Sequence, residues 1–286
     1  MRARSSPVTP GVWQTVRAMA LATHFGPTVA VTTVGTLLAV SAGVQEWRVG
    51  LVGSAVLAGQ ASIGWSNDWL DADRDRAVAR TDKPTVQGLL TPRLLRSAAL
   101  TAVLVAVVTS LALGVVPGLL LLTVVAGGWA YNAGLKRNAA SMLPYLVAFG
   151  ALPAGVVAAA PGTPAAPWWL IAAGAALGGA AHLANVAPDL EDDLATGVHG
   201  LPHQLGATRS AVCGALLLAT ASLLLVLGPA GPPTTAGWVA LVVAVPTAVV
   251  AGLAGTARFR RIAFPAVLLL TVTDVGLLVV GGAALA

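Results

Sequence analysis

Two short acidic segments interrupt an otherwise apolar chain, and they hold the residues best suited to chemistry. The first runs from Asn67 to Asp75 and the second from Asn185 to Asp193, and each contains the pattern N-x-x-x-D-x-x-x-D. Eight of the 11 Asp and Glu residues in the sequence lie in these two segments. A carboxylate near hydrocarbon is costly unless it is paired, hydrated or bound to a cation. The two segments therefore predict a divalent-metal site.

The spacing within each segment selects the side chains that can act together, because residues i, i+3, i+4 and i+8 share one face of a helix. In the first segment this face holds one amide and three carboxylates: Asn67, Asp68, Asp71 and Asp75. In the second it holds one amide and two carboxylates: Asn185, Asp189 and Asp193. Three further acidic residues lie off these faces: Asp73, Glu191 and Asp192. Mg2+ takes oxygen ligands, usually one or two carboxylates with waters and substrate phosphates.

Basic residues lie near both segments and could contact the phosphates of a metal-bound diphosphate. Arg80 and Lys83 follow the first segment, and Lys136 and Arg137 lie in a later loop. Arg and Lys are common phosphate donors. A metal ion held by the carboxylates would neutralise charge that develops on a diphosphate leaving group.

The composition of the whole chain indicates a membrane protein. Of the 286 residues 57% are hydrophobic and 9% are charged, whereas a soluble domain carries about 25% charge. The apolar runs do not alternate as β-barrel strands do, so we expect an all-α polytopic membrane protein. We expect one domain over 1–286 with a polar tail at 1–13. Apolar runs of spanning length predict nine transmembrane helices, at about 18–43, 50–70, 94–114, 117–133, 142–160, 167–187, 208–228, 236–256 and 263–284.

The basic residues predict the orientation of these spans. With nine spans, 15 of the 16 Lys and Arg residues fall on one side of the membrane, and Arg48 alone falls on the other. The positive-inside rule makes the basic side cytoplasmic. Both acidic segments end spans on that side, so we expect them to face each other. The basic residues are scattered and have no interleaved aromatic residues, which argues against a nucleic-acid partner.

The combined motifs resemble those of UbiA-type intramembrane prenyltransferases. Asn67-Asp68-x-x-Asp71-x-x-x-Asp75, followed by Arg80-Thr81-x-Lys83-Pro84, is similar to the first signature of that family. Asp189-x-x-x-Asp193, running into Leu201-Pro202-His203-Gln204-Leu205-Gly206, is similar to the second. The segment from Tyr131 to Arg137, followed by Pro144-Tyr145, resembles a third motif of that family, which lies between the two signatures in the sequence. The resemblance covers nearly the whole chain and implies nine helices around a central cavity that opens to lipid.

The resemblance also implies roles for individual residues in Mg2+-dependent transfer of a prenyl group from a prenyl diphosphate. It implies a metal site formed by one amide and five carboxylates: Asn67, Asp68, Asp71, Asp75, Asp189 and Asp193. It implies phosphate contacts from four cations: Arg80, Lys83, Lys136 and Arg137. Tyr131 would lie near the reacting allylic carbon, and Asp71, Asp189, Lys136 and Tyr131 would be the catalytic residues. The acceptor would be lipophilic, such as an aromatic or quinone-precursor molecule, within a cell membrane.

Some residues depart from the family pattern or stand beside it. Lys83 replaces a frequent Arg, and His24 occupies a part of the first helix where the family usually has a basic residue. His24 is either a substrate-binding residue or a hydrogen-bonded packing residue. Asp274, within the last predicted span, is either functional or a protonated structural carboxyl group. Gln60, two turns before the first acidic segment, and Asn185 are further substrate-binding candidates.

Two other functions remain open at this point. A terpene cyclase could use the same metal site, with the substrate's own double bonds capturing the allylic cation. A carrier of cations or phosphate is less favoured, because carriers place polar groups near the midplane, whereas these charges gather on one side.

Overall fold

The computed structural model describes residues 11–195, 197–253, 269, 271–273 and 276, and the regular structure of this part of the chain is entirely helical. The α-helices are α1 Val12–Ala22, α2 Phe25–Ser41, α3 Glu46–Leu70, α4 Ala72–Ala77, α5 Pro92–Ala112, α6 Val115–Ala133, α7 Leu143–Ala158, α8 Trp168–Val186, α9 Leu190–Ala195, α10 Leu201–Leu227 and α11 Thr235–Leu253. Three short 3-10 helices join them: η1 Leu135–Arg137, η2 Ala139–Met142 and η3 Ala187–Asp189.

The helices have the lengths and composition of a membrane protein, which confirms the predicted fold class. In the described part of the chain, six helical segments are long and apolar enough to cross a membrane, and the bent pair of α1 and α2 makes a seventh if it counts as one span. The predicted division between spans at Gly114 is present, because α5 ends and α6 begins there. The helix α11 covers most of the eighth predicted span (236–256) and begins one residue before it. Most of the ninth predicted span (263–284), including Asp274, lies outside the described residues.

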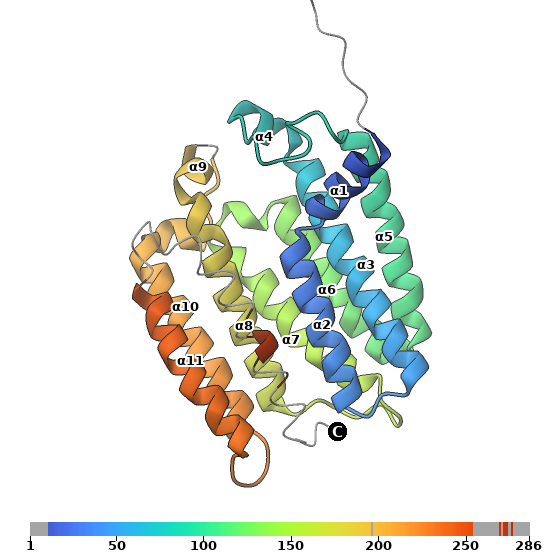
Figure 1. Ribbon diagram of the computed structural model, residues 1–286, viewed down its shortest axis with the longest axis vertical. Helices are drawn as coiled ribbons and strands as arrows, with labels where there is room; N and C mark the ends of the chain where they lie inside the picture. Colours follow the sequence, from blue (N-terminus) through green and yellow to red (C-terminus); the bar gives the residue numbers. More distant parts are fainter. Residues whose placement is uncertain (1–10, 196, 254–268, 270, 274–275, 277–286) are drawn as a thin grey trace, which may run out of the picture.

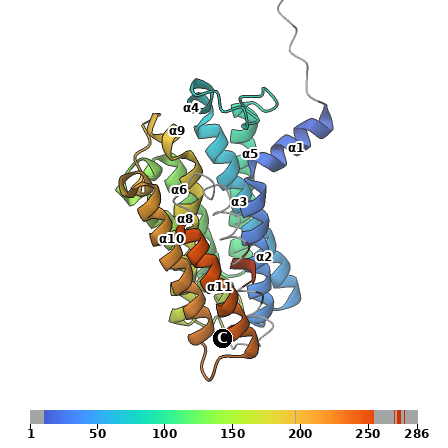
Figure 2. The ribbon, with the colours of Figure 1, turned by 60° about the vertical axis from the view of Figure 1, so that its left-hand side comes forward.

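The first predicted span is wrong as a single straight helix. The helices α1 and α2 meet at a bend of 63°, and His24 lies at the break with φ 59° and ψ 63°. Figure 2 shows α1 leaving the bundle at an angle to α2. Pro27 explains the break, because it has no N–H to donate to the Thr23 carbonyl, as a continuous helix would require. The Thr28 hydroxyl donates to that carbonyl instead, at a distance of 2.7 Å.

The helix α3 passes this break in close contact, and Gly64 makes the contact possible. A Cβ atom at Gly64 would lie 2.5 Å from the Thr23 carbonyl carbon and oxygen. We therefore expect Gly64→Ala to lower the free energy of unfolding by about 1–3 kcal/mol, through overpacking. Thermal unfolding of the purified protein in detergent measures this. The control is Gly50→Ala in the same helix, where an added Cβ meets no atom within 4 Å. Equal midpoints for the two variants would contradict the close packing.

The helices form one bundle with a fixed order of neighbours (Figure 1). The helix α3 packs against α2, α5 and α6, α7 packs against α6 and α8, and α10 packs against α8 and α11. Small residues allow the close approach of α7 and α8, as in many membrane bundles. A Cβ atom at Gly178 would lie 2.5 Å from the carbonyl oxygen of Tyr145. The aromatic side chains of α7 are thereby held beside α8.

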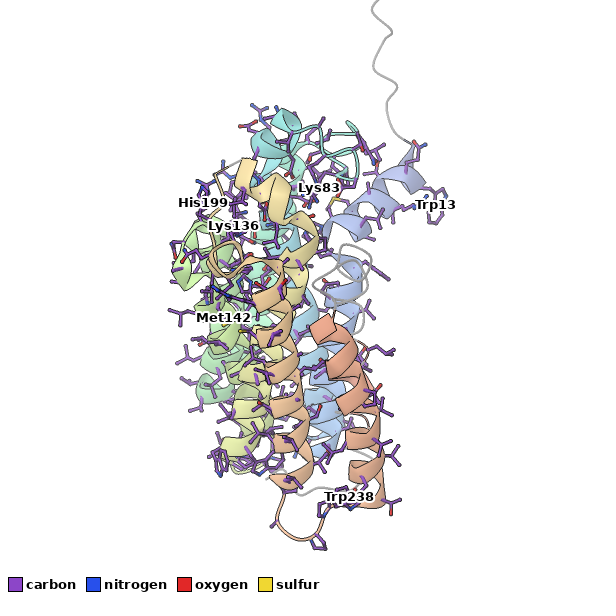
Figure 3. All side chains as sticks on the ribbon, turned by 90° about the vertical axis from the view of Figure 1, so that its left-hand side faces the viewer. Trp13, Lys83, Lys136, Met142, His199 and Trp238 are labelled. Carbon is purple, nitrogen blue, oxygen red and sulfur yellow. The ribbon has the colours of Figure 1, made fainter. Side chains whose placement is uncertain are left out.

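The two ends of the bundle differ. The short helices α4 and α9 lie at one end, and the loop between α10 and α11 lies at the other (Figure 1). Figure 3 shows Lys83 and Lys136 near the first end and Trp238 at the opposite end. Arg48, in the first turn of α3, donates to the carbonyl oxygens of Ala159 at 3.0 Å and Leu113 at 2.6 Å. These residues cap α7 and α5, so Arg48 joins three helix ends there.

Candidate active site

A cavity of about 500 Å³ lies among α2, α3, α6, α7 and α8, and both acidic segments line it. Its polar lining comprises Thr23, His24, Gln60, Asn67, Asp68, Asp71, Arg74, Arg80, Asp82, Lys83, Tyr131, Asn132, Lys136, Tyr145, Asn185, Asp189 and Asp193. Its apolar lining includes Val31, Val124, Ala148 and Phe149. The structure thus brings together two segments that are more than 100 residues apart in the sequence, as their predicted positions on the same side of the membrane suggest.

The first acidic segment keeps its helical register although α3 ends within it. Asp71 lies between α3 and α4 with near-helical angles (φ −92°, ψ −1°). Its N–H donates to the Asn67 carbonyl at 2.9 Å, and its own carbonyl accepts from the Asp75 N–H at 2.8 Å. Asp68, Asp71 and Asp75 are all buried. Asp73 points away, as its spacing predicts, with a side chain that is 93% exposed and pairs with Arg76.

The second acidic segment changes helix type along its length. The helix α8 ends at Val186, η3 follows, and α9 begins at Leu190. Pro188 lies in the first turn of η3, and its missing N–H explains why α8 does not continue unchanged. Asn185, Asp189 and Asp193 nevertheless all line the cavity. The side chains of Glu191 and Asp192 lie outside the described part of the structure.

Each lysine of the cavity forms a short ion pair with a carboxylate of the first segment. The ammonium nitrogen of Lys83 lies 2.7 Å from Asp68. That of Lys136 donates to both oxygens of Asp71, at 2.6 Å each. Burial lowers the pKa of the Lys136 ammonium group, and the Asp71 carboxylate opposes this shift. Both pairs are nearly dry, so their charges interact more strongly than on an exposed surface.

Arg80 links the loop after α4 to the second acidic segment. It donates to Asp189 at 3.4 Å and makes two hydrogen bonds, of 3.0 and 3.1 Å, to Asp82. The bond to Asp82 raises the pKa of the Arg80 guanidinium, and the same bond lowers the pKa of Asp82. Asp82 is thus a further carboxylate of the cavity, and its place in the sequence between the predicted phosphate-binding residues Arg80 and Lys83 was the available signal for it.

Arg74 and Asn132 are two further cavity residues that sequence reasoning missed. The guanidinium of Arg74 lies 3.1 Å from Asp71 and 3.8 Å from Asp193. Asn132 donates to the Ile63 carbonyl and to the Ser66 hydroxyl, at 2.9 Å each, and its side-chain oxygen accepts from Asn67 at 3.2 Å. The i, i+3 spacing from Asp71 was the available signal for Arg74. Asn132 follows Tyr131 in the middle motif but carries no charge to mark it.

Not every candidate residue lines the cavity. Arg137 is exposed and lies outside its lining, in contrast to its neighbour Lys136. Asp75 is 1% exposed, is not part of the lining, and has one carboxylate oxygen, Oδ2, with no hydrogen-bond partner. Burial raises the pKa of Asp75. His24 and Gln60 do line the cavity, and Nε2 of His24 lies 3.7 Å from Asp68.

Aromatic rings form another part of the cavity lining. The rings of Tyr131 and Tyr145 meet edge to face, with centroids 5.1 Å apart. Tyr145 is also nearly parallel to Phe149, with centroids 6.2 Å apart. Together with the apolar lining residues, these rings form a surface suited to a hydrocarbon chain. The cavity therefore has a charged region and an apolar region, as an amphiphilic substrate requires.

The residues of the charged region fit Mg2+ only if a phosphate group completes the coordination. Within the described residues, no three His, Cys, Asp or Glu side chains converge to enclose an ion by themselves. The donors are nevertheless hard oxygen atoms, which Mg2+ prefers, and Mg2+ commonly binds through one or two carboxylates with substrate phosphates. Asp75 lies outside the cavity lining, but its buried Oδ2 has no hydrogen-bond partner and is a further oxygen of the first segment that could take a ligand.

Comparison with known proteins shows the family and the fold of the chain. A model of the UbiA prenyltransferase family matches residues 28–283. Among solved structures, a UbiA homolog from Aeropyrum pernix K1 is similar at 19% identity and a TM-score of 0.71, over 88% of this chain and 97% of that chain. A UbiA homolog from Archaeoglobus fulgidus, bound to GPP and Mg2+, is similar at 14% identity and a TM-score of 0.67, over 93% of this chain and 99% of that chain. A digeranylgeranylglyceryl phosphate synthase is similar at 13% identity and a TM-score of 0.66, over 94% of this chain and 99% of that chain. No curated protein matched the sequence.

Proposed function

The chain belongs to the UbiA prenyltransferase family, and on this premise we propose that it transfers a prenyl group from a prenyl diphosphate to a lipophilic acceptor, with Mg2+ as cofactor. One observation carries the proposal: two acidic segments and four basic side chains line a single cavity whose remaining walls are aromatic and apolar. The charged region suits a diphosphate with its metal, and the apolar region suits a prenyl chain. An aromatic or quinone-precursor molecule is the class of acceptor that we propose.

We assign the metal-binding role to the oxygen ligands of the two acidic segments: Asn67, Asp68, Asp71, Asp75, Asp189 and Asp193. When bound there, Mg2+ supplies positive charge to the diphosphate as it leaves. Asn132 holds the amide of Asn67, and Asn67 in turn donates to Asp71 at 3.3 Å. These contacts orient the first segment toward the cavity before substrate arrives.

The basic side chains have a second role in this scheme, which is to bind phosphate oxygens. Lys83, Lys136 and Arg80 each contact a carboxylate in the structure. When metal and diphosphate enter, each cation can exchange its carboxylate partner for a phosphate oxygen, and no charge is left unpaired. Lys136 is the most buried of the three, so its attraction for the leaving diphosphate is least screened by water. Arg137 is exposed, and its proposed role is limited to attracting phosphate.

The reaction that follows needs water to be excluded from the apolar region. Breakage of the bond between the allylic carbon and the diphosphate oxygen leaves an allylic cation, and the acceptor then forms a new bond to that carbon and loses a proton. We place Tyr131 beside the reacting carbon, with Tyr145 and Phe149 behind it. Aromatic faces stabilise a nearby cation and shield it from water. His24, Gln60 and Asn185 line the same cavity and are proposed to orient the substrates.

The proposed setting is a cell membrane, with the charged end of the bundle toward the cytoplasm. The apolar helices support the first part, and the one-sided distribution of Lys and Arg supports the second. Prenyl diphosphate would then enter from the cytoplasm with its tail toward the lipid.

Product analysis tests the proposal. Purified protein is incubated with Mg2+, an extract of membrane lipids as the source of acceptor, and geranyl, farnesyl or geranylgeranyl diphosphate. We expect Mg2+-dependent release of diphosphate and a product whose mass is the sum of a prenyl group and an acceptor. A hydrocarbon product formed without the lipid extract would assign the chain to the cyclases instead. If none of the three substrates gives Mg2+-dependent release, the proposal fails.

A further inference from the structure

Arg74 contacts carboxylates of both acidic segments, and no other basic side chain of the described residues does so. One nitrogen lies 3.1 Å from Asp71 and another lies 3.8 Å from Asp193. Lys83 and Lys136 contact only the first segment, and Arg80 contacts Asp189 and Asp82. The guanidinium of Arg74 therefore lies between the two segments that the proposed function assigns to metal binding.

This position sets Arg74 in competition with a divalent cation. A metal ion that binds Asp71 or Asp193 meets a positive charge already in contact with both carboxylates. It must either displace the guanidinium or bear its repulsion, because two cations cannot use the same carboxylate oxygens without cost. The side chain of Arg74 is 21% exposed, and it belongs to the six-residue helix α4 at the end of the bundle, so it has room to turn aside.

We propose that Arg74 is a built-in counter-cation that prevents the site from binding a divalent metal without diphosphate. This inference rests on the proposed function of the cavity. When metal and diphosphate enter together, a phosphate gives the guanidinium a new partner, and Asp71 and Asp193 become available to the metal. A guanidinium suits both tasks, because its planar fork of donors matches the geometry of both carboxylate and phosphate. Metal loading is thereby coupled to substrate binding.

Direct metal binding tests this inference without an activity assay. Mn2+ is the probe, because it takes the same kinds of oxygen ligands as Mg2+, and its electron paramagnetic resonance signal reports the free ion. We expect Arg74→Met, which removes the charge and keeps much of the length, to lower the dissociation constant for Mn2+ about tenfold or more in buffer without diphosphate, since it removes a unit charge a few ångströms away. At saturating Mg2+, the same variant should bind geranyl thiodiphosphate more weakly, because a phosphate partner is lost.

Two other variants control the measurement. Arg76→Met removes a charge from the same helix, but Arg76 is 53% exposed and pairs with Asp73, so it should bind Mn2+ as the native protein does. Arg74→Lys retains the charge and should also keep the weak binding. Size-exclusion chromatography checks folding, and Arg74→Gln replaces Arg74→Met if the latter does not give folded protein.

The outcomes separate this inference from the proposed function. Mn2+ binding by the uncharged Arg74 variant that is no tighter than in the native protein overturns the counter-cation, whatever happens to the thiodiphosphate. If Mn2+ binds more tightly but no prenyl diphosphate is turned over, the counter-cation is supported and the proposed enzymatic function fails.

Discussion

Replacing Asp71 with alanine is expected to lower the rate of Mg2+-dependent diphosphate release about a hundredfold to a thousandfold. Asp71 lies at the centre of the charged region, where Lys136, Arg74 and Asn67 all contact its carboxylate. Its loss removes a proposed metal ligand and also the group that positions Lys136. Removal of one preorganised electrostatic contact from an active site costs about this much in other enzymes. The measurement is the initial rate of diphosphate release from a prenyl diphosphate at saturating Mg2+.

Asp73→Ala is the matched control for Asp71→Ala. It removes a carboxylate two residues away, on the same short stretch of chain, whose side chain is 93% exposed. Its rate should stay within about twofold of the native rate, because a surface ion pair contributes little. If Asp71→Ala retained a rate similar to that of Asp73→Ala, the helical face that defines the site would be wrongly assigned.

Replacing Lys136 with methionine is expected to reduce both activity and stability. The side chain of Lys136 is 5% exposed and that of Asp71 is 3% exposed, so the variant leaves a buried carboxylate with only Arg74 and Asn67 as partners. Breaking a buried pair from one side typically costs about 3 kcal/mol of folding free energy. The rate of diphosphate release should fall about a hundredfold, because a buried donor to the leaving group is lost. Thermal unfolding and initial rates measure the two effects.

A double variant separates the two effects of Lys136. Adding Asp71→Asn to Lys136→Met removes the unpaired negative charge of Asp71. The double variant should therefore be more stable than Lys136→Met alone, while its activity stays low. Arg137→Met, which changes the exposed neighbour, is the control for stability alone. It should have the same midpoint of thermal unfolding as the native protein. The single variants Lys136→Met and Asp71→Asn are measured as well. If the loss of stability in the double variant equals the sum of the losses in these two single variants, the buried ion pair does not exist.

The parts of the site that follow local rules were predictable from sequence. The face formed by Asn67, Asp68 and Asp71 depends only on helical spacing, and hydrogen bonds from Asp71 to Asn67 and from Asp75 to Asp71 preserve that spacing across the end of α3. The resemblance to the UbiA family, confirmed by the family match, and the all-helical membrane fold follow from motifs and composition in the same way. The motifs and the apolar composition extend over most of the chain, so small local irregularities do not obscure either prediction.

The parts that depend on contacts between distant segments were not predictable. The break at His24 requires Pro27 to be recognised as part of the first turn of a new helix rather than as the interior of one long helix, and apolar composition hides this. Arg74 falls within the first acidic segment, but only the approach of Asp193 from the other side of the cavity gives it a bridging position. Asp75 shares the predicted face and yet lies outside the cavity lining, because helical spacing does not state how deep a side chain will be buried.

The binding of a prenyl diphosphate analogue is the measurement that tests most directly whether the two acidic segments act as one metal site. Calorimetric titration of the purified protein with geranyl thiodiphosphate is carried out with Mg2+ and with a chelator. We predict that binding requires Mg2+ and is lost to a similar extent in Asp71→Ala, in Asp189→Ala and in the double variant, because each segment supplies part of one site. Equal binding in the presence of the chelator, or undiminished binding in both single variants, would contradict the shared metal site.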